Sequence, residues 1–279
     1  MEVVMALLPS IYEDKLKEYI CVKMPDELRL TVGQPLQVRS GCEETSIWPV
    51  LSQNDLDLVL RAACRQSVYA YNETVRHGYI TIEGGHRIGI CGFGVVEKGE
   101  VQTIRTVSTV LIRIAKQFLG CADKLLPCIS GSTLILGPPG SGKTTLMRDL
   151  VRQLSDKRKN RVALADERGE LSAGSLGIPQ LQVGARTDVM VNVPKADAAM
   201  MLLRTMNPQW IAMDEITSVE DISAMEQIAY CGVQVLATAH GKGIEDLTAR
   251  PLYRKMMTRG IFHTIVVLQQ DKTFTVQEI

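Results

Sequence analysis

One segment combines glycines, a lysine and a threonine at a spacing that binds phosphate. Residues 137–144 read Gly-Pro-Pro-Gly-Ser-Gly-Lys-Thr and fit the pattern G-x-x-x-x-G-K-[ST]. Glycines let backbone amides converge on phosphate oxygens, and the N-terminus of the helix expected next adds positive potential. The lysine would reach the β- and γ-phosphates, and the Thr144 hydroxyl would hold Mg²⁺. We predict that ATP and Mg²⁺ bind here, and the predicted binding residues are Gly137, Pro138, Pro139, Gly140, Ser141, Gly142, Lys143, Thr144 and Thr145.

Two acidic residues end an apolar run further along the chain. Residues 210–213 read Trp-Ile-Ala-Met, and Asp214 and Glu215 follow directly. An apolar strand that ends in two acids is the Walker B pattern. Asp214 would orient the Mg²⁺ shell and Glu215 would polarise the attacking water. An isolated acidic pair is commonly a solvated strand end, so this prediction depends on the phosphate-binding loop upstream.

Two further polar segments follow apolar runs. Residues 165–170 read Ala-Asp-Glu-Arg-Gly-Glu, and residues 238–241 read Thr-Ala-His-Gly. In a parallel sheet both segments would lie beside the phosphate crevice. We predict that an acid of the first segment helps to hold a metal-bound or nucleophilic water and assign this role to Glu167, while Asp166 and Glu170 stay open. The alternative is a local ion pair in a charged loop. His240 would sense the γ-phosphate, the alternative being an ordinary structural histidine.

Arginines are the remaining candidates for catalysis, because phosphoryl transfer benefits from a cation that neutralises developing charge. Arg105 and Arg113 lie in the N-terminal half of the chain. We predict that one of them closes over the γ-phosphate. The alternative is that both are ordinary surface residues.

Composition excludes several classes of protein. The chain has 279 residues, 46% hydrophobic and 22% charged, which is typical of a globular protein with one large or two ordinary domains. Its net charge of zero provides no overall field for nucleic acid or acidic lipid. The seven cysteines are scattered without a C-x-x-C pair, so we expect reduced thiols, no zinc and a cytosolic location. We find no signal-peptide pattern and no apolar run of about 18 residues.

The two halves of the chain predict different architectures. In the first half we expect a helix over residues 1–20 that is broken near Pro9, and a strand pair at 27–36 and 45–50. A helix over 56–71, which Ser52 and Asp55 would cap, should follow. We then expect a meander over 79–104 and a helix over 112–126. In the second half, short apolar runs alternate with helical patterns. This alternation favours a parallel sheet covered on both faces, and residues 270–279 favour an edge hairpin. We therefore predict an N-terminal domain over 1–129 and an ATPase domain over 130–279.

The order of these motifs resembles the type II/IV secretion ATPase superfamily. Within it, eight short segments resemble the family of stage III sporulation AA proteins: ELRL (27–30), SVYA (67–70), GYITI (78–82), GGHR (84–87), DER (166–168), TDV (187–189), PK (194–195) and DEI (214–216). The resemblance implies an α/β fold, a RecA-like P-loop NTPase core with a smaller N-terminal α+β domain. By position, Lys143, Thr144, Glu215 and His240 match the superfamily's functional residues. The chain departs from the superfamily at Arg168, where proline is usual, and at Thr217, where glycine is expected.

The same resemblance implies a biological role. It implies a hexameric ATPase that hydrolyses ATP to power or gate assembly of a secretion-type channel between mother cell and forespore during sporulation. ATP would lie between the N-terminal domain and the core. The implied partners are membrane-embedded channel subunits, such as stage III sporulation protein AB. The implied location is the mother-cell cytoplasm, peripheral at the membrane, and no nucleic-acid partner is expected.

Two alternatives stay open. The chain could be a RecA-like ATPase acting on nucleic acid, for which residues 157–159 (Lys-Arg-Lys) provide a local basic stretch, but the zero net charge and 5% aromatic content argue against it. It could also be a nucleotide-gated scaffold with negligible turnover.

Overall fold

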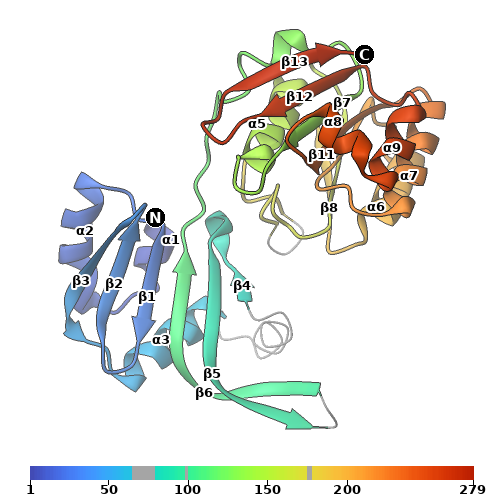
Figure 1. Cartoon of the computed structure of the whole chain (residues 1–279). Helices are drawn as coiled ribbons and strands as arrows, with labels where there is room; N and C mark the ends of the chain where they lie inside the picture. The colour runs from blue at the N-terminus through green and yellow to red at the C-terminus, as the bar shows by residue number, and fades with distance from the viewer. Residues whose placement is uncertain (65–78, 98–99, 175–177) are drawn as a thin grey trace. The chain divides into compact units, whose positions relative to one another are not determined.

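The computed structural model describes residues 1–64, 79–97, 100–174 and 178–279, and it divides into two compact units (Figure 1). The first unit is Met1–Lys116 and the second is Gln117–Ile279. Each unit has a sheet and a hydrophobic core of its own.

In its described residues, the N-terminal unit contains a six-stranded sheet in the order β3-β2-β1-β6-β5-β4, with antiparallel pairing of neighbours. The strands are β1 (Glu27–Thr31), β2 (Pro35–Ser40), β3 (Glu43–Val50), β4 (Tyr79–Thr81), β5 (Arg87–Glu97) and β6 (Glu100–Arg113). Alternating residues such as Leu28, Leu30, Leu36 and Val38 face the core, which is the period of a half-buried strand.

The described residues of this unit also form short helices: α1 (Glu2–Met5), η1 (Ser10–Tyr12), α2 (Glu13–Val22), α3 (Gln53–Ala63) and η2 (Glu83–Gly85). The expected interruption at Pro9 is confirmed, since α1 and α2 lie on either side of it. The expected capping box is also confirmed, because the Ser52 side chain accepts the Asp55 N–H and the Asp55 carboxylate accepts the Ser52 N–H. Helix α3 ends at Ala63, and residues 65–71 of the longer expected helix lie outside the described residues.

Two expectations for this half are wrong. Residues 27–50 form three strands instead of two, because Gly33, in the left-handed region with φ +74°, turns the chain between β1 and β2. The helix expected over 112–126 does not form. Strand β6, which is rich in β-branched residues, pairs with β1 and β5 as far as Arg113, so the first two residues of the expected helix belong to the sheet. Further along, Gly120 has φ +83° and turns the chain.

The described residues of the C-terminal unit contain a seven-stranded sheet in the order β13-β12-β7-β11-β10-β8-β9. The strands are β7 (Thr133–Gly137), β8 (Val162–Asp166), β9 (Thr187–Val191), β10 (Trp210–Met213), β11 (Gln234–His240), β12 (Thr264–Leu268) and β13 (Phe274–Glu278). Their pairings are parallel except for the β12–β13 hairpin at the edge, as expected. Strand β9 was not expected from its partly exposed, unpatterned residues.

Helices cover both faces of this sheet, as predicted. They are η3 (Leu126–Cys128), α5 (Lys143–Asp156), α6 (Lys195–Thr205), α7 (Val219–Tyr230), α8 (Ile244–Ala249) and α9 (Pro251–Thr258). Leu134 and Leu136 of β7 pack in the core cluster of α6 and α7, whereas Ile135 packs in the cluster of α5. Among the described residues, no helix has the length and apolarity needed to cross a membrane.

The observed division between the units falls at Lys116 and Gln117, earlier than the predicted boundary at 129 and 130. The reason is packing. Ala122, Leu125 and Ile129 are buried in the core cluster of α5. The Ala122 N–H also donates to Asp149 Oδ2 at 2.8 Å. The segment before β7 therefore belongs to the C-terminal unit.

Candidate functional site

The loop after β7 has a backbone that depends on its glycines. Gly140 and Gly142 adopt φ +73° and +97°, values that favour glycine. A Cβ on Gly137 would lie 2.5 Å from Ser141 Oγ and 2.9 Å from the Leu268 carbonyl oxygen, so a side chain does not fit there. Helix α5 begins at Lys143 and directs its N-terminal amides toward this loop, the arrangement expected for an anion site.

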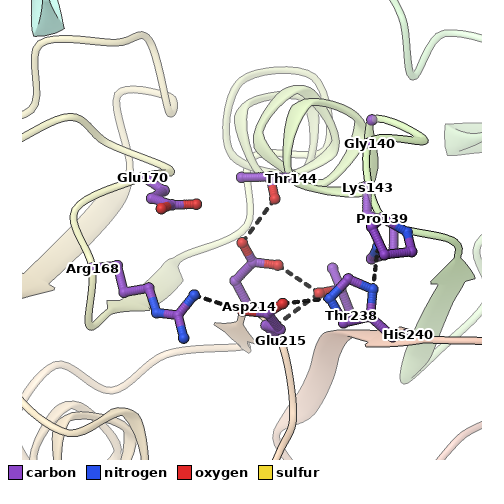
Figure 2. A pocket seen from close by; sticks show the side chains of 11 residues that line it. Pro139, Gly140, Lys143, Thr144, Arg168, Glu170, Asp214, Glu215, Thr238 and His240 are labelled. Carbon is purple, nitrogen blue, oxygen red and sulfur yellow. Dashed lines mark hydrogen bonds and ion pairs between the residues drawn. The ribbon is translucent and has the colours of Figure 1, made fainter. Parts of the chain in front are cut away.

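Lys143 folds back over the loop and contacts a histidine from another strand. Its Nζ donates to the carbonyl oxygens of Gly137 at 3.0 Å and Pro138 at 3.1 Å, and it lies 3.1 Å from His240 Nδ1 (Figure 2). Burial lowers the pKa of Lys143, and the carboxylates of Asp214 and Glu215 partly offset this shift. The lysine is thus a cation held near three acceptors that a phosphate could replace.

Asp214 lies between two hydroxyl groups. Thr144 Oγ1 donates to Asp214 Oδ2 at 3.0 Å, and Thr238 Oγ1 donates to Asp214 Oδ1. A threonine hydroxyl and a carboxylate are hard oxygen donors, which suit Mg²⁺. Thr144 and Asp214 could therefore hold a Mg²⁺ ion.

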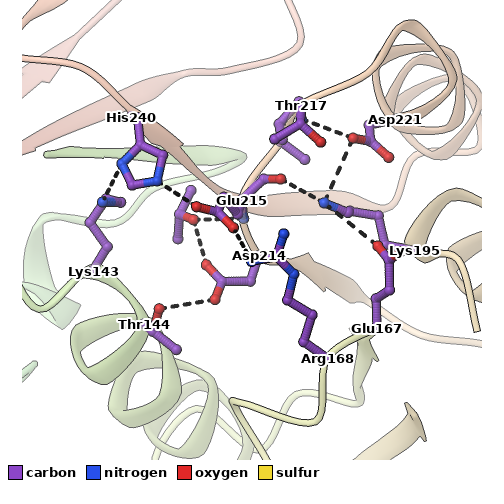
Figure 3. Close-up of polar contacts among 12 residues, drawn as sticks. Lys143, Thr144, Glu167, Arg168, Lys195, Asp214, Glu215, Thr217, Asp221 and His240 are labelled. Carbon is purple, nitrogen blue, oxygen red and sulfur yellow. Dashed lines mark hydrogen bonds and ion pairs between the residues drawn. The ribbon is translucent and has the colours of Figure 1, made fainter. Parts of the chain in front are cut away.

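Glu215 has both carboxylate oxygens occupied. Oε1 contacts His240 Nε2, and Oε2 accepts from Arg168 Nη1 at 2.9 Å (Figure 3). Burial by itself would raise the pKa of Glu215, but the hydrogen bond to His240 and the Arg168 charge outweigh it and hold the pKa low. Glu215 is thus an ionised carboxylate beside the phosphate-binding loop.

The backbone of Glu215 is also unusual. Its φ is +55°, uncommon for a residue with a side chain and typical of a position held by its surroundings. Lys195 Nζ donates to the Glu215 carbonyl oxygen at 2.6 Å, and the Glu215 N–H donates to Thr238 Oγ1 at 2.8 Å. Contacts from α6 and β11 therefore set the position of this residue.

The acidic segment after β8 divides into residues with different surroundings. Asp166 is buried and accepts the backbone N–H groups of Glu170, Leu171 and Ser172, so it organises the loop. Glu167 Oε2 lies 3.7 Å from Lys195 Nζ, and Glu167 lines a small adjoining pocket. Glu170 lines the main pocket, which is the cavity beside the phosphate-binding loop.

The main pocket has a volume of about 380 Å³, in the range of small-molecule sites. Its lining comes from the carboxyl ends of four parallel strands and from the N-terminus of α5. The lining residues are Pro139, Gly140, Gly142, Lys143, Thr144, Arg168, Glu170, Asp214, Glu215, Thr238 and His240. The structure thus brings the predicted phosphate, metal, glutamate and histidine positions to one cavity.

The remaining predicted residues lie elsewhere. Gly137, Pro138, Ser141 and Thr145 belong to the loop and to the first turn of α5 without lining the pocket. Arg105 and Arg113 lie on β6 in the N-terminal unit, where Arg113 Nε is 3.5 Å from Glu27 Oε1 and both side chains are exposed. Their contact with phosphate stays a prediction.

Two positions near the loop were missed by sequence reasoning. In the sequence, Lys195 belongs only to the Pro-Lys pair that resembles the sporulation family. A lysine at the start of a helix does not by itself indicate a contact with a distant residue. Lys272, between β12 and β13, donates from Nζ to the Gly140 carbonyl oxygen at 2.8 Å. No motif surrounds it in the sequence.

The chain is similar to known proteins over most of its length. A family model described as Sporulation stage III, protein AA matches residues 3–279. Stage III sporulation protein AA of Bacillus subtilis (strain 168) is 36% identical over 255 residues, which cover 88% of this chain and 83% of that protein. The similarity therefore extends over both units.

Solved structures show the fold. The Legionella pneumophila ATPase DotB has a TM-score of 0.61 and 17% identity, covering 96% of this chain and 80% of that chain. The pilus retraction motor PilT, solved with bound ADP, has a TM-score of 0.64 and 18% identity, covering 93% of this chain and 78% of that chain. The predicted α/β fold, a RecA-like P-loop core with a smaller N-terminal α+β unit, is confirmed.

Proposed function

The chain belongs to the sporulation stage III protein AA family, and on this premise we propose that it binds and hydrolyses ATP with Mg²⁺. One observation carries the proposal. Lys143, the Thr144–Asp214 pair and Glu215 line one cavity at the end of a parallel sheet. These are a phosphate-binding cation, a pair of magnesium ligands and a base for water.

The proposed reaction uses these residues in distinct roles. Loop amides and Lys143 bind the β- and γ-phosphates, and Mg²⁺, held by Thr144 and Asp214, would neutralise phosphate charge. Glu215 accepts a hydrogen bond from the attacking water and takes its proton. The water oxygen bonds to the γ-phosphorus while the bond to the β–γ bridging oxygen breaks. ADP leaves with that electron pair, and the proton passes from Glu215 to solvent.

A phosphate-release assay tests the proposal. Lys143→Ala removes the phosphate-binding cation, so we expect loss of both nucleotide binding and turnover. Glu215→Gln keeps the shape but removes the base, so nucleotide binding should persist while kcat falls about 100-fold or more. Lys255→Ala and Glu245→Gln, at exposed residues of α9 and α8, are the matched controls.

The outcomes separate the candidate functions. Near-wild-type turnover in both site variants contradicts the catalytic assignment. A wild-type chain that binds ATP without releasing phosphate supports a nucleotide-gated scaffold, a candidate favoured by the contacts that occupy both Glu215 oxygens. Salt-sensitive binding of single-stranded DNA or RNA would support the nucleic-acid alternative instead.

The cellular role is a further part of the proposal. Membership of the family supports a role in sporulation. We propose, from the sequence resemblance, a homo-hexamer in the mother-cell cytoplasm that powers or gates assembly of a secretion-type channel through membrane-embedded sporulation proteins. In such a ring, Arg105 or Arg113 would close over the γ-phosphate as the units move. Mass measurement in solution with and without an ATP analogue tests assembly. A monomer under both conditions contradicts a ring formed by this chain alone.

A further inference from the structure

Arg168 faces the phosphate-binding loop from the opposite wall of the pocket. Figure 2 shows Arg168 and Glu170 on one side, Lys143 and His240 on the other, and Thr144 with Asp214 between them. The Arg168 side chain is 68% exposed, so it reaches into the cavity rather than packing into the core. The pocket thus has a cation on each of two walls.

The loop that carries Arg168 is anchored next to the arginine. Arg148, buried on α5, donates from Nε to the Leu171 carbonyl oxygen at 2.6 Å and from Nη2 to the Glu170 carbonyl oxygen at 2.7 Å. Asp166 holds the N–H groups of the same segment. The backbone of the loop that carries Arg168 is therefore held in place beside the pocket.

The contact of Arg168 with Glu215 conflicts with the proposed role of that glutamate. Arg168 contacts Oε2 and His240 contacts Oε1, and the positive charge of Arg168 lowers the pKa of Glu215, which weakens the carboxylate as a base for water. An exposed arginine–carboxylate pair contributes little to stability and is readily exchanged for a stronger partner. A triphosphate in the cavity carries several negative charges and offers arginine bidentate oxygens.

We propose that Arg168 is a further catalytic residue, which leaves Glu215 when ATP enters the pocket and binds the γ-phosphate from the side opposite Lys143. This inference rests on the proposed ATPase function. During transfer, Arg168 neutralises charge on the γ-phosphate oxygens while water adds to phosphorus and ADP leaves with the electrons of the broken bond. The same movement frees Glu215 Oε2 to accept the water proton.

This role differs from that predicted for Arg105 and Arg113. Arg168 lies in the same unit as Lys143 and lines the same cavity, so its action requires no rearrangement of the two units.

The test uses the full chain with Arg168→Ala and Arg168→Lys, and Arg254→Ala on α9 as an exposed control. Phosphate release gives kcat and KM, and fluorescent ADP and a non-hydrolysable ATP analogue give affinities. For Arg168→Ala we expect kcat to fall about 100-fold. Affinity for the ATP analogue should fall about tenfold while that for ADP changes little, because ADP lacks the γ-phosphate. Lysine should restore part of the loss.

Each outcome decides the inference. An unchanged or faster kcat in Arg168→Ala overturns it, since an arginine that only restrained Glu215 would slow the enzyme. If wild type binds ATP without turnover, the affinities decide: an unchanged ATP-to-ADP ratio overturns the γ-phosphate contact, and a reduced ratio supports it. A wild-type chain that binds no nucleotide refutes the proposed function itself. Thermal unfolding confirms that the variants are folded.

Discussion

Lys195 contacts the carbonyl oxygen of Glu215 rather than its carboxylate, and this distinction defines what it can do. The lysine is largely buried, with its side chain 11% exposed, and it also lies 3.7 Å from Glu167 and 3.8 Å from Asp221 (Figure 3). Because it contacts the backbone of Glu215, which has φ +55°, we expect Lys195 to act on the proposed catalysis by positioning.

We therefore expect Lys195→Met to lower kcat about tenfold with KM changed less than twofold, because the nucleotide contacts remain while Glu215 loses its anchor. Steady-state phosphate release measures both constants. Lys195→Arg should recover part of kcat by restoring the donor, and Lys255→Met on α9 serves as the control. An equal loss in Lys195→Met and Lys255→Met would argue against positioning.

His86 is a second residue whose surroundings set its chemistry. It is 4% exposed, and its Nδ1 accepts the Ala115 N–H at 3.0 Å. Burial, with a smaller contribution from the N-terminal amino group, lowers the pKa of His86 to about 4. The folded N-terminal unit thus favours a neutral imidazole.

This shift predicts acid sensitivity. The unfolded state takes up a proton on His86 near its ordinary pKa of about 6.5, whereas the folded state does so only near pH 4. The free energy of unfolding is therefore complete above about pH 7 and falls, by up to about 3 kcal/mol, as the pH drops toward 4. Urea unfolding at several pH values measures this. His86→Asn, which keeps an acceptor for Ala115, should show a flatter dependence, and a slope equal to wild type would contradict the assignment.

Helices α7 and α3 both begin with a capping box, and the cap of α7 lies beside the candidate site. Ser218 caps α7 directly after the Walker B segment, with Asp221 accepting the N–H groups of Thr217 and Ser218 at 3.0 Å. Asp221 is also near Lys195, so the cap and the anchor of Glu215 form one network. Ser52 forms the same capping box on α3 in the other unit.

The two caps should therefore behave differently when removed. Ser218→Ala and Ser52→Ala should each cost about 1 kcal/mol of unfolding free energy, because each leaves an N-terminal amide without its acceptor. Ser218→Ala should also reduce turnover, whereas Ser52→Ala should leave turnover per folded molecule unchanged. Urea unfolding and phosphate release are the measurements. Equal turnover in both variants would show that the α7 cap has no connection to the site.

At the scale of the whole molecule, the chain divides into two units, so fragments of the chain can test where the boundary between the units lies. The residues that line the pocket all belong to the C-terminal unit, and the segment before β7 packs into its core. Lys157 and Arg158 of the same unit contact that segment, at Asp123 Oδ1 and at the Leu126 carbonyl oxygen.

We expect fragment 117–279 to fold cooperatively and to bind an ATP analogue. Fragment 130–279, which begins at the boundary predicted from sequence, should be less stable by several kcal/mol, because it lacks the buried side chains of Leu125 and Ile129. Thermal unfolding and nucleotide titration compare the two. Equal stability of both fragments would contradict the packing argument for the boundary.

The family, the fold class and the phosphate-binding loop could be predicted from the sequence because they depend on local patterns. The loop needs particular residue types at particular spacings, a parallel sheet covered by helices needs short apolar runs, and a capping box needs two residues three positions apart. The places of Glu215 and His240 beside the loop could be predicted for the same reason, since each lies at the carboxyl end of an apolar strand.

Only the tertiary structure decided which distant groups meet. Lys195 and Arg168 reach Glu215 from other elements, and Lys272 reaches Gly140 across 132 positions in the chain. Residues 112–113 continue a strand because their pairing with β1 and β5 overrides the local preference for a helix. Residues 117–129 belong to the second unit because their apolar side chains are buried against α5. Such contacts join residues far apart in the chain, so no spacing in the sequence encodes them.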